Sequence, residues 1–188
     1  MRHHVAMRRA RHLTALPLAA IAAIGLAAVS GPAAHADPTP SQTVFTKKLL
    51  DDAKTSAGVK RMLTNKSAIV DPRSGFVDVT GDGRHDALIL VSTGGAGSAV
   101  ALYVFSTHGQ ATEQTDDQTS LRVVFRLQSL YGASLRISGT TLSILEPRYA
   151  KGDDLCCPEK LRERDYAFDA KALTFRRTAD RDTPFTTT

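Results

Sequence analysis

Five residues between positions 78 and 86 have the spacing of a calcium-binding loop. They are Asp78, Thr80, Asp82, Arg84 and Asp86. Gly83 lies where such loops turn sharply, and the backbone carbonyl of Arg84 would supply one ligand. Alternating positions of a tight loop place their oxygens on its inner side, so the stretch predicts a calcium site. Against such a site, Ile89 stands in place of the bidentate glutamate. The loop is not an EF-hand, because the residues that follow it are expected to form a strand.

The same stretch also fits a turn that needs no ion. Gly81 and Gly83 allow positive φ angles, and Asp78 and Asp82 can accept hydrogen bonds from nearby backbone amides as Asx turns. In this interpretation the loop only leads the chain into the apolar run that begins at Ala87. Both interpretations stay open in the sequence. A calcium site here would have a low affinity, suited to the millimolar calcium of extracellular fluid.

Cys156 and Cys157 are the second candidate for chemistry, and they are adjacent in the chain. Neighbouring Cα atoms are about 3.8 Å apart, whereas ordinary disulfides need about 4.4 Å or more. A bond between the two would therefore be strained and easy to reduce. The pair could form a vicinal disulfide, stay as buried thiols, link two chains or form a mixed disulfide. We expect the vicinal disulfide, with a redox switch as the alternative, although the CxxC spacer is missing.

The sequence after residue 36 is poor in catalytic motifs. It contains two histidines, His85 and His108, and no G-x-S-x-G or HExxH motif. The glycine-rich segment 94–98 lacks the Lys-Ser/Thr ending of a phosphate-binding loop. Paired acids such as Asp116 and Asp117 lie in polar loops, where solvated carboxylates are ordinary. This inventory argues against an enzyme.

The first 36 residues have the three parts of a secretory signal peptide. Four arginines precede residue 12, an apolar run covers residues 13–29, and Ala34-His35-Ala36 forms a small-residue cleavage site. The apolar run is shorter than the roughly 20 residues of a membrane-spanning helix. We therefore predict cleavage after Ala36 and a secreted or extracellular protein without a membrane span, which can associate with the cell wall.

Removal of the signal peptide changes the charge balance of the protein. The whole chain has 24 basic and 19 acidic residues, and four of the basic residues but none of the acidic ones precede residue 37. The remaining 152 residues therefore carry 20 basic and 19 acidic side chains, a net charge of +1. A nearly neutral chain gives no reason to expect a nucleic-acid partner. We expect a monomer that binds an extracellular or cell-wall ligand.

The hydrophobic pattern predicts an α+β fold, with one or two N-terminal helices packed on a mostly antiparallel β-meander of about seven strands. Helical periodicity covers residues 45–53 and 59–63, and the period changes to two after Pro72. The expected strands are 87–91, 99–105, 121–127, 135–137, 142–144, 166–168 and 173–175. We assign 1–36 to the signal peptide, 37–44 to a linker, 45–180 to one domain and 181–188 to a disordered tail.

Two resemblances accompany these patterns. The Asp-Gly turn, DVTGDGRHD at residues 78–86, resembles those of FG-GAP and VCBS-type β repeats, which implies calcium binding before a strand. Residues 70–178, with the CCP motif at 156–158 and the closing RDYAFDAKALTF hairpin, resemble the LppP/LprE-type exported domain of actinobacteria. That resemblance implies an envelope or secreted protein without an assigned activity. Many such proteins are lipoproteins, but this chain lacks the lipidation cysteine.

Together these patterns predict a secreted, non-enzymatic domain that associates with the envelope or binds an unknown ligand, with calcium as a structural ion. The alternative, from a different class, is a small exported thiol-disulfide or hydrolytic enzyme.

Overall fold

The computed structural model describes residues 38–71, 74–94, 98–109, 121–152 and 158–185. The chain divides into two units, Met1–Ala36 and Asp37–Thr188, and every described residue belongs to the second. The predicted signal peptide and both cysteines lie outside the described residues. Within the described ranges, no helix has the length and apolar character needed to cross a membrane.

Two helices precede the strands: α1 (Pro40–Asp51) and α2 (Ala57–Thr64). Helix α1 begins inside the predicted linker 37–44, which corrects that boundary. Thr39 caps the helix, and its side chain and that of Gln42 each accept a hydrogen bond from the other residue's backbone amide. Pro40 occupies the first turn, where its fixed φ is favourable and its missing N–H costs nothing. These local signals start the helix before its apolar stripe begins.

Eight strands follow in the described part of the chain: β1 (Ala68–Val70), β2 (Gly75–Val77), β3 (Asp86–Thr93), β4 (Ser98–Ser106), β5 (Arg122–Ser138), β6 (Thr141–Arg148), β7 (Lys160–Asp169) and β8 (Thr174–Pro184). All pairs are antiparallel, and the sheet order is β1-β3-β4-β5-β6-β7-β8, with β2 also paired to β3. The predicted α+β class and antiparallel meander are confirmed. Two predicted strands, 121–127 from Arg122 onward and 135–137, are parts of β5.

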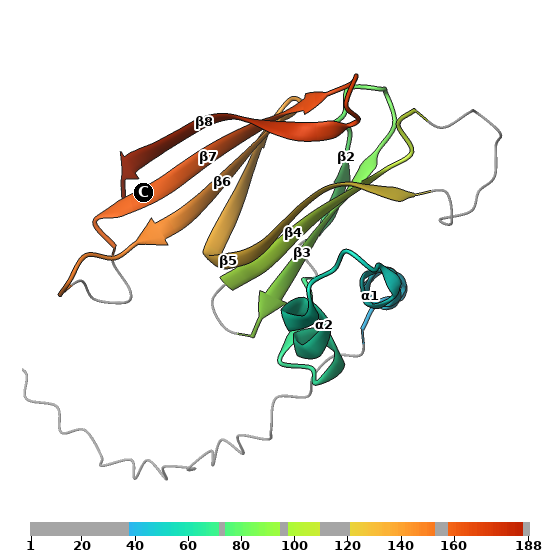
Figure 1. The fold of residues 1–188 in the computed structure, drawn as a ribbon, viewed down its shortest axis with the longest axis horizontal. Coiled ribbons are helices and arrows are strands. Elements are labelled where there is room, and N and C mark those ends of the chain that lie inside the picture. Colours follow the sequence, from blue (N-terminus) through green and yellow to red (C-terminus); the bar gives the residue numbers. More distant parts are fainter. Residues whose placement is uncertain (1–37, 72–73, 95–97, 110–120, 153–157, 186–188) are drawn as a thin grey trace, which may run out of the picture. The chain divides into compact units, whose positions relative to one another are not determined.

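Strand β5 bends in its middle and belongs to both halves of the sheet. Its first part pairs with β4, and Ser134–Ser138 pair with β6. Between these parts, Ser129 and Gly132 have φ angles of 64° and 58°. We call Ser134–Ser138 together with β6, β7 and β8 the C-terminal half of the sheet. Figure 1 shows β6–β8 on one side of β5, with the helices beside β3 and β4 on the other.

The hydrophobic core has two parts because neighbouring residues of β3 point to opposite faces of the sheet. Leu88 packs with β4 residues and with Leu142, Ile144 and Tyr166 of the C-terminal half. Ile89 packs instead with residues of both helices, including Leu49 and Val59. One core therefore lies between the two halves of the sheet, and the other lies under the helices.

A polar network fixes the helices to the sheet. Gln128 Oε1 accepts hydrogen bonds from the hydroxyl of Tyr103 at 3.0 Å and from the backbone amide of Ser56 at 2.6 Å. Arg126 donates to Asp52, the residue directly after α1, at 3.0 Å. Desolvation raises the pKa of the Tyr103 phenol above its ordinary value and keeps it protonated as a donor.

The predicted disordered tail is wrong for residues 181–184, because β8 continues to Pro184. Arg181 pairs across the strands with Glu163 and donates to Asp165 Oδ2 at 2.7 Å. The two charged residues of this segment, Arg181 and Asp182, thus both form ion pairs with other strands of a solvated sheet. The domain therefore extends at least four residues beyond the predicted end at residue 180.

Candidate functional site

The Asp-Gly loop connects β2 to β3, and Asp78 organises it. Its Oδ1 accepts hydrogen bonds from the amides of Gly81 at 2.7 Å and Asp82 at 3.2 Å, and its Oδ2 accepts from Gly83 at 2.8 Å. Desolvation of the carboxyl opposes ionisation, but these amide donors outweigh it and hold the pKa of Asp78 below its ordinary value. Gly81 and Gly83 have φ angles of 75° and 81°, which the turn requires.

Asp86 joins the start of the loop to its end. Its carboxylate Oδ2 accepts hydrogen bonds from the backbone amides of Val79 and Thr80, each at 2.9 Å. The hydroxyl of Thr80 lies 3.4 Å from Oδ1 of the same carboxylate. Only 1% of the surface of Asp86 is exposed, so these donors replace the water that a solvated acid would bind.

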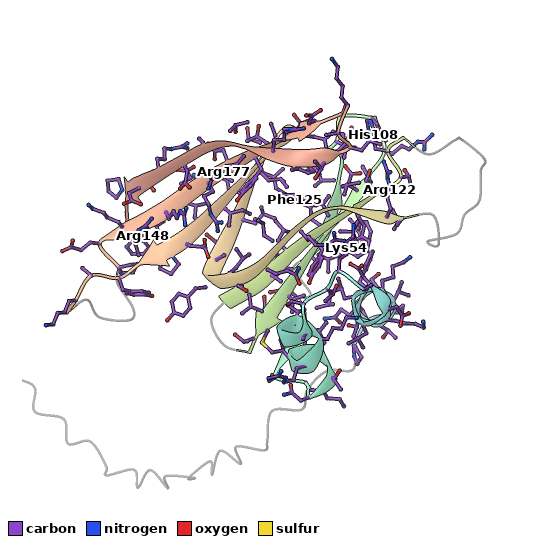
Figure 2. All side chains as sticks on the ribbon, viewed as in Figure 1. Lys54, His108, Arg122, Phe125, Arg148 and Arg177 are labelled. Carbon is purple, nitrogen blue, oxygen red and sulfur yellow. The ribbon has the colours of Figure 1, made fainter. Side chains whose placement is uncertain are left out.

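His108, which follows β4, lies against this loop. Its Nδ1 is 3.4 Å from Asp82 Oδ2, and its ring makes an edge contact with Phe168 at a centroid distance of 4.9 Å. Arg122 donates to the carbonyl oxygen of His108 at 2.6 Å. Figure 2 shows His108 and Arg122 together at one end of the sheet, far from Arg148. The sequence does not predict this contact, because His108 and Asp82 are 26 positions apart and only the fold brings them together.

The predicted calcium ligands are close in sequence, but their carboxylates face different groups. Asp78 and Asp86 accept from separate sets of backbone amides, and Asp82 Oδ1 accepts from the amide of Arg84 at 2.9 Å. The described ranges contain no group of three or more His, Cys, Asp or Glu side chains placed to hold a metal ion. The observed hydrogen bonds between loop amides and carboxylates are therefore those of a turn that holds its shape without an ion. Calcium binding stays a prediction.

Replacing Asp78 by alanine should lower the free energy of unfolding by about 1 to 3 kcal/mol, because three loop amides lose their acceptor. The loss should be the same with millimolar calcium and with a chelator if the turn acts alone. Urea denaturation of wild type and Asp78→Ala under both conditions measures this. A wild-type melting temperature that rises with calcium, while that of the variant does not, would instead establish an ion in the loop.

A small cavity lies beside the N-terminus of α1. Its volume is about 70 Å³, and its lining includes Thr39, Gln42, Phe45, Ser74, Phe76 and Ile89. Phe76 is 53% exposed and contacts Phe45 at a ring-centroid distance of 6.2 Å. Pockets that bind small-molecule ligands are usually about 300 to 1,000 Å³. This cavity is therefore too small to enclose a typical substrate.

Ion pairs cover the C-terminal half of the sheet, near the end of β8. Arg162 donates two hydrogen bonds to Asp180, at 2.8 and 2.7 Å, and Arg177 donates a third at 2.7 Å. The hydrogen bond from Arg162, aided by the charge of Arg177, lowers the pKa of Asp180 to about 2. Figure 2 shows Arg177 on this part of the sheet.

The Asp180 pairs should make stability depend on pH in the acid range. The folded pKa of about 2 lies below the ordinary value of 3.8, so the stabilisation is complete above pH 4 and disappears as the pH falls through 2. The urea midpoint of wild type should exceed that of Asp180→Asn above pH 4, and the two should converge near pH 2. Low salt is needed because salt screens exposed pairs. A pH-independent difference would contradict this prediction.

Cys156 and Cys157 lie outside the described residues, so the fold does not place the cysteine pair relative to the Asp-Gly loop. Comparison with protein-family models, with curated proteins and with solved structures found no match for this chain. Function must therefore be inferred from the geometry of the site and from the sequence.

Proposed function

We propose that this chain is an exported, non-enzymatic domain that binds a ligand at the cell envelope. The observation that carries the proposal is the bonding of the acids at the candidate site. Asp78 and Asp86 accept hydrogen bonds from backbone amides, and Asp82 adjoins His108. In the described part of the chain, the one hydroxyl that bonds to these acids is that of Thr80, 3.4 Å from Asp86, and Thr80 is only 6% exposed to a substrate. A nucleophile needs a base within hydrogen-bond reach, and these groups act instead as turn-forming acceptors.

The shape of the site supports recognition on the surface. The cavity of about 70 Å³ beside α1 does not enclose a substrate-sized molecule, whereas several large apolar side chains are exposed on strands. Binding proteins commonly present such side chains on a rigid sheet. In this proposal, any calcium in the Asp-Gly loop would be structural, because it would replace interactions that hold the turn.

Export is tested by expressing the full chain, with its own leader, in an actinobacterial host. We expect the protein in the medium or the cell-wall fraction, with an N-terminus that begins at Asp37. N-terminal sequencing of each fraction measures this directly. Recovery from the cytosol with Met1 intact would reject the export on which the proposal depends.

Binding is tested with the protein purified from that medium. We expect it to sediment with isolated actinobacterial cell walls in a saturable way, while a secreted protein of similar size and charge stays in the supernatant. Failure to sediment at any protein concentration tested would reject envelope binding. Thiol labelling with and without reductant tests the enzyme alternative, because a catalytic cysteine pair must cycle between both states.

A further inference from the structure

The helical segment is basic, although the chain after residue 36 is nearly neutral. Residues 38–71 contain six basic and three acidic side chains, a net charge of +3. The rest of the chain after residue 36 contains 14 basic and 16 acidic side chains, a net charge of −2. The charge is therefore divided unevenly between the segment that forms the helices and the remainder of the protein.

The three acids of this segment are already occupied or buried. Asp51 forms an ion pair with Lys47 at 2.6 Å. Asp52 forms one with Arg126 of β5 at 3.0 Å. Asp71 is buried, with 3% of its surface exposed. Within the described ranges, the other five basic side chains of the segment form no ion pair: Lys48, Lys54, Lys60, Arg61 and Lys66.

These five cations belong to one layer of the fold. Both helices pack on the same face of the sheet, and α1 contacts α2. Lys48 lies in the last turn of α1, and Lys60 and Arg61 lie in α2. Lys54 lies in the connection between the helices, where Figure 2 labels it, and Lys66 follows α2.

The size of this layer favours a ligand with repeated charges. A helix rises about 1.5 Å per residue, so α1 and α2 are about 18 and 12 Å long. The five cations are distributed along both helices and the connection between them. A small anion could contact only a part of this set, whereas a polymer that carries a charge on every unit could contact several cations at once.

The apolar faces of both helices are already buried, which argues against a membrane as the partner. Phe45 and Leu49 of α1 lie in the core under the helices, together with Val59 and Leu63 of α2. A helix that lies in a membrane interface needs such a face to insert among the lipids. The exposed residues of α2 are small or polar: Ala57, Gly58, Arg61 and Thr64. A hydrated polyanion therefore fits this surface better than a bilayer.

We propose that the outer surface of the helical layer binds an anionic polymer of the cell envelope, one with phosphate or carboxylate groups along its chain. We call Lys48, Lys54, Lys60, Arg61 and Lys66 the basic helical surface. This inference rests on the proposed envelope binding and specifies its surface and its ligand class. The attraction is between solvated charges, so it weakens with salt and needs no enclosed pocket.

The probes are fluorescein-labelled polyphosphate and polygalacturonate, which carry phosphate and carboxylate groups respectively. Fluorescence anisotropy at about 50 mM salt should show that wild type binds at least one of them, while labelled dextran, which is uncharged, stays free. The triple variant Lys54→Gln/Lys60→Gln/Lys66→Gln should bind at least about tenfold more weakly. Its plot of log K against log salt should be shallower by about one unit for each lysine that contacts the polymer.

A second triple variant controls for net charge. Lys151, Lys160 and Lys171 are exposed, lie outside the helices and form no ion pair within the described part of the chain. Lys151→Gln/Lys160→Gln/Lys171→Gln removes the same charge and should bind within about threefold of wild type, because salt screens distant charges. Lysine and glutamine have similar helix propensities, and thermal melts confirm that both variants are folded.

The outcomes separate this surface from the proposed function. Equal weakening in both triple variants, or none in the helical one, would reject the basic helical surface. Wild type that binds neither polymer would reject the ligand class, and sedimentation of that protein with phosphatidylglycerol vesicles would assign the surface to a membrane instead. In each case, saturable binding of wild type to whole walls would leave the proposed function intact, and failure to bind them would reject that function as well.

Discussion

Replacing Asp86 by alanine should lower the free energy of unfolding by about 3 to 5 kcal/mol, one of the two largest effects we expect. The carboxylate is almost completely buried and is the acceptor for two backbone amides, those of Val79 and Thr80. Alanine leaves both donors buried without an acceptor, and each such group costs about 1 to 3 kcal/mol. The variant also loses the connection between the start of the loop and β3.

Urea denaturation at neutral pH measures the Asp86 effect. Asp86→Asn keeps one side-chain oxygen and should lose less than the alanine variant. Asp182→Ala removes an exposed acid from β8 and should change stability by less than about 1 kcal/mol. An Asp86→Ala protein as stable as Asp182→Ala would show that water or a rearranged loop satisfies the two amides.

Glu146→Ala is the second substitution with a large expected effect, about 2 to 4 kcal/mol. Glu146 forms an ion pair with Arg164, and the two side chains are only 15% and 14% exposed. It also accepts the amide of Tyr131. Removing the acid leaves a mostly buried guanidinium without its counter-charge, and such a loss usually exceeds the net contribution of the intact pair.

A double variant distinguishes the cost of leaving Arg164 without a counter-charge from the cost of lost side-chain packing. Glu146→Leu/Arg164→Leu removes both charges and should recover at least half of the stability lost in Glu146→Leu, because the buried arginine is gone. Denaturation of the two single variants and the double variant completes the cycle. Equal and additive losses would mean that water already screens the pair. The amide of Tyr131 lacks its acceptor in each Glu146 variant, so that cost cancels in the comparison.

Local sequence signals predicted the fold where one segment contained the information. Ser138-Gly139 separates β5 from β6 and Asp169 ends β7, and both turns lie between apolar alternations. Strands β1 and β2 were missed because three residues are too few to show a period. Strand β5 was divided in two because the positive φ at Ser129 and Gly132 interrupts its alternation without ending it.

The candidate sites were predictable only in part, for a related reason. The Asp-Gly loop is contiguous, so its turn geometry followed from the spacing of Asp78, Gly81 and Gly83. His108 reaches Asp82 only through the pairing of β3 with β4. The cations of the basic helical surface are grouped only because α1 and α2 pack on the same face of the sheet. Contacts between distant segments depend on strand register and helix packing, which hydrophobic periodicity alone does not specify.

The bent strand β5 couples the stability of one core to that of the other. Its residues Phe125 and Leu130 contribute to the core between the two halves, and its Gln128 holds the segment before α2. Without β5, both β4 and β6 would lose a hydrogen-bonded neighbour. A fragment that ends before Thr141 would also expose the apolar face that the C-terminal half covers. The domain should consequently melt in one cooperative step, and no autonomous piece should survive limited proteolysis within β5.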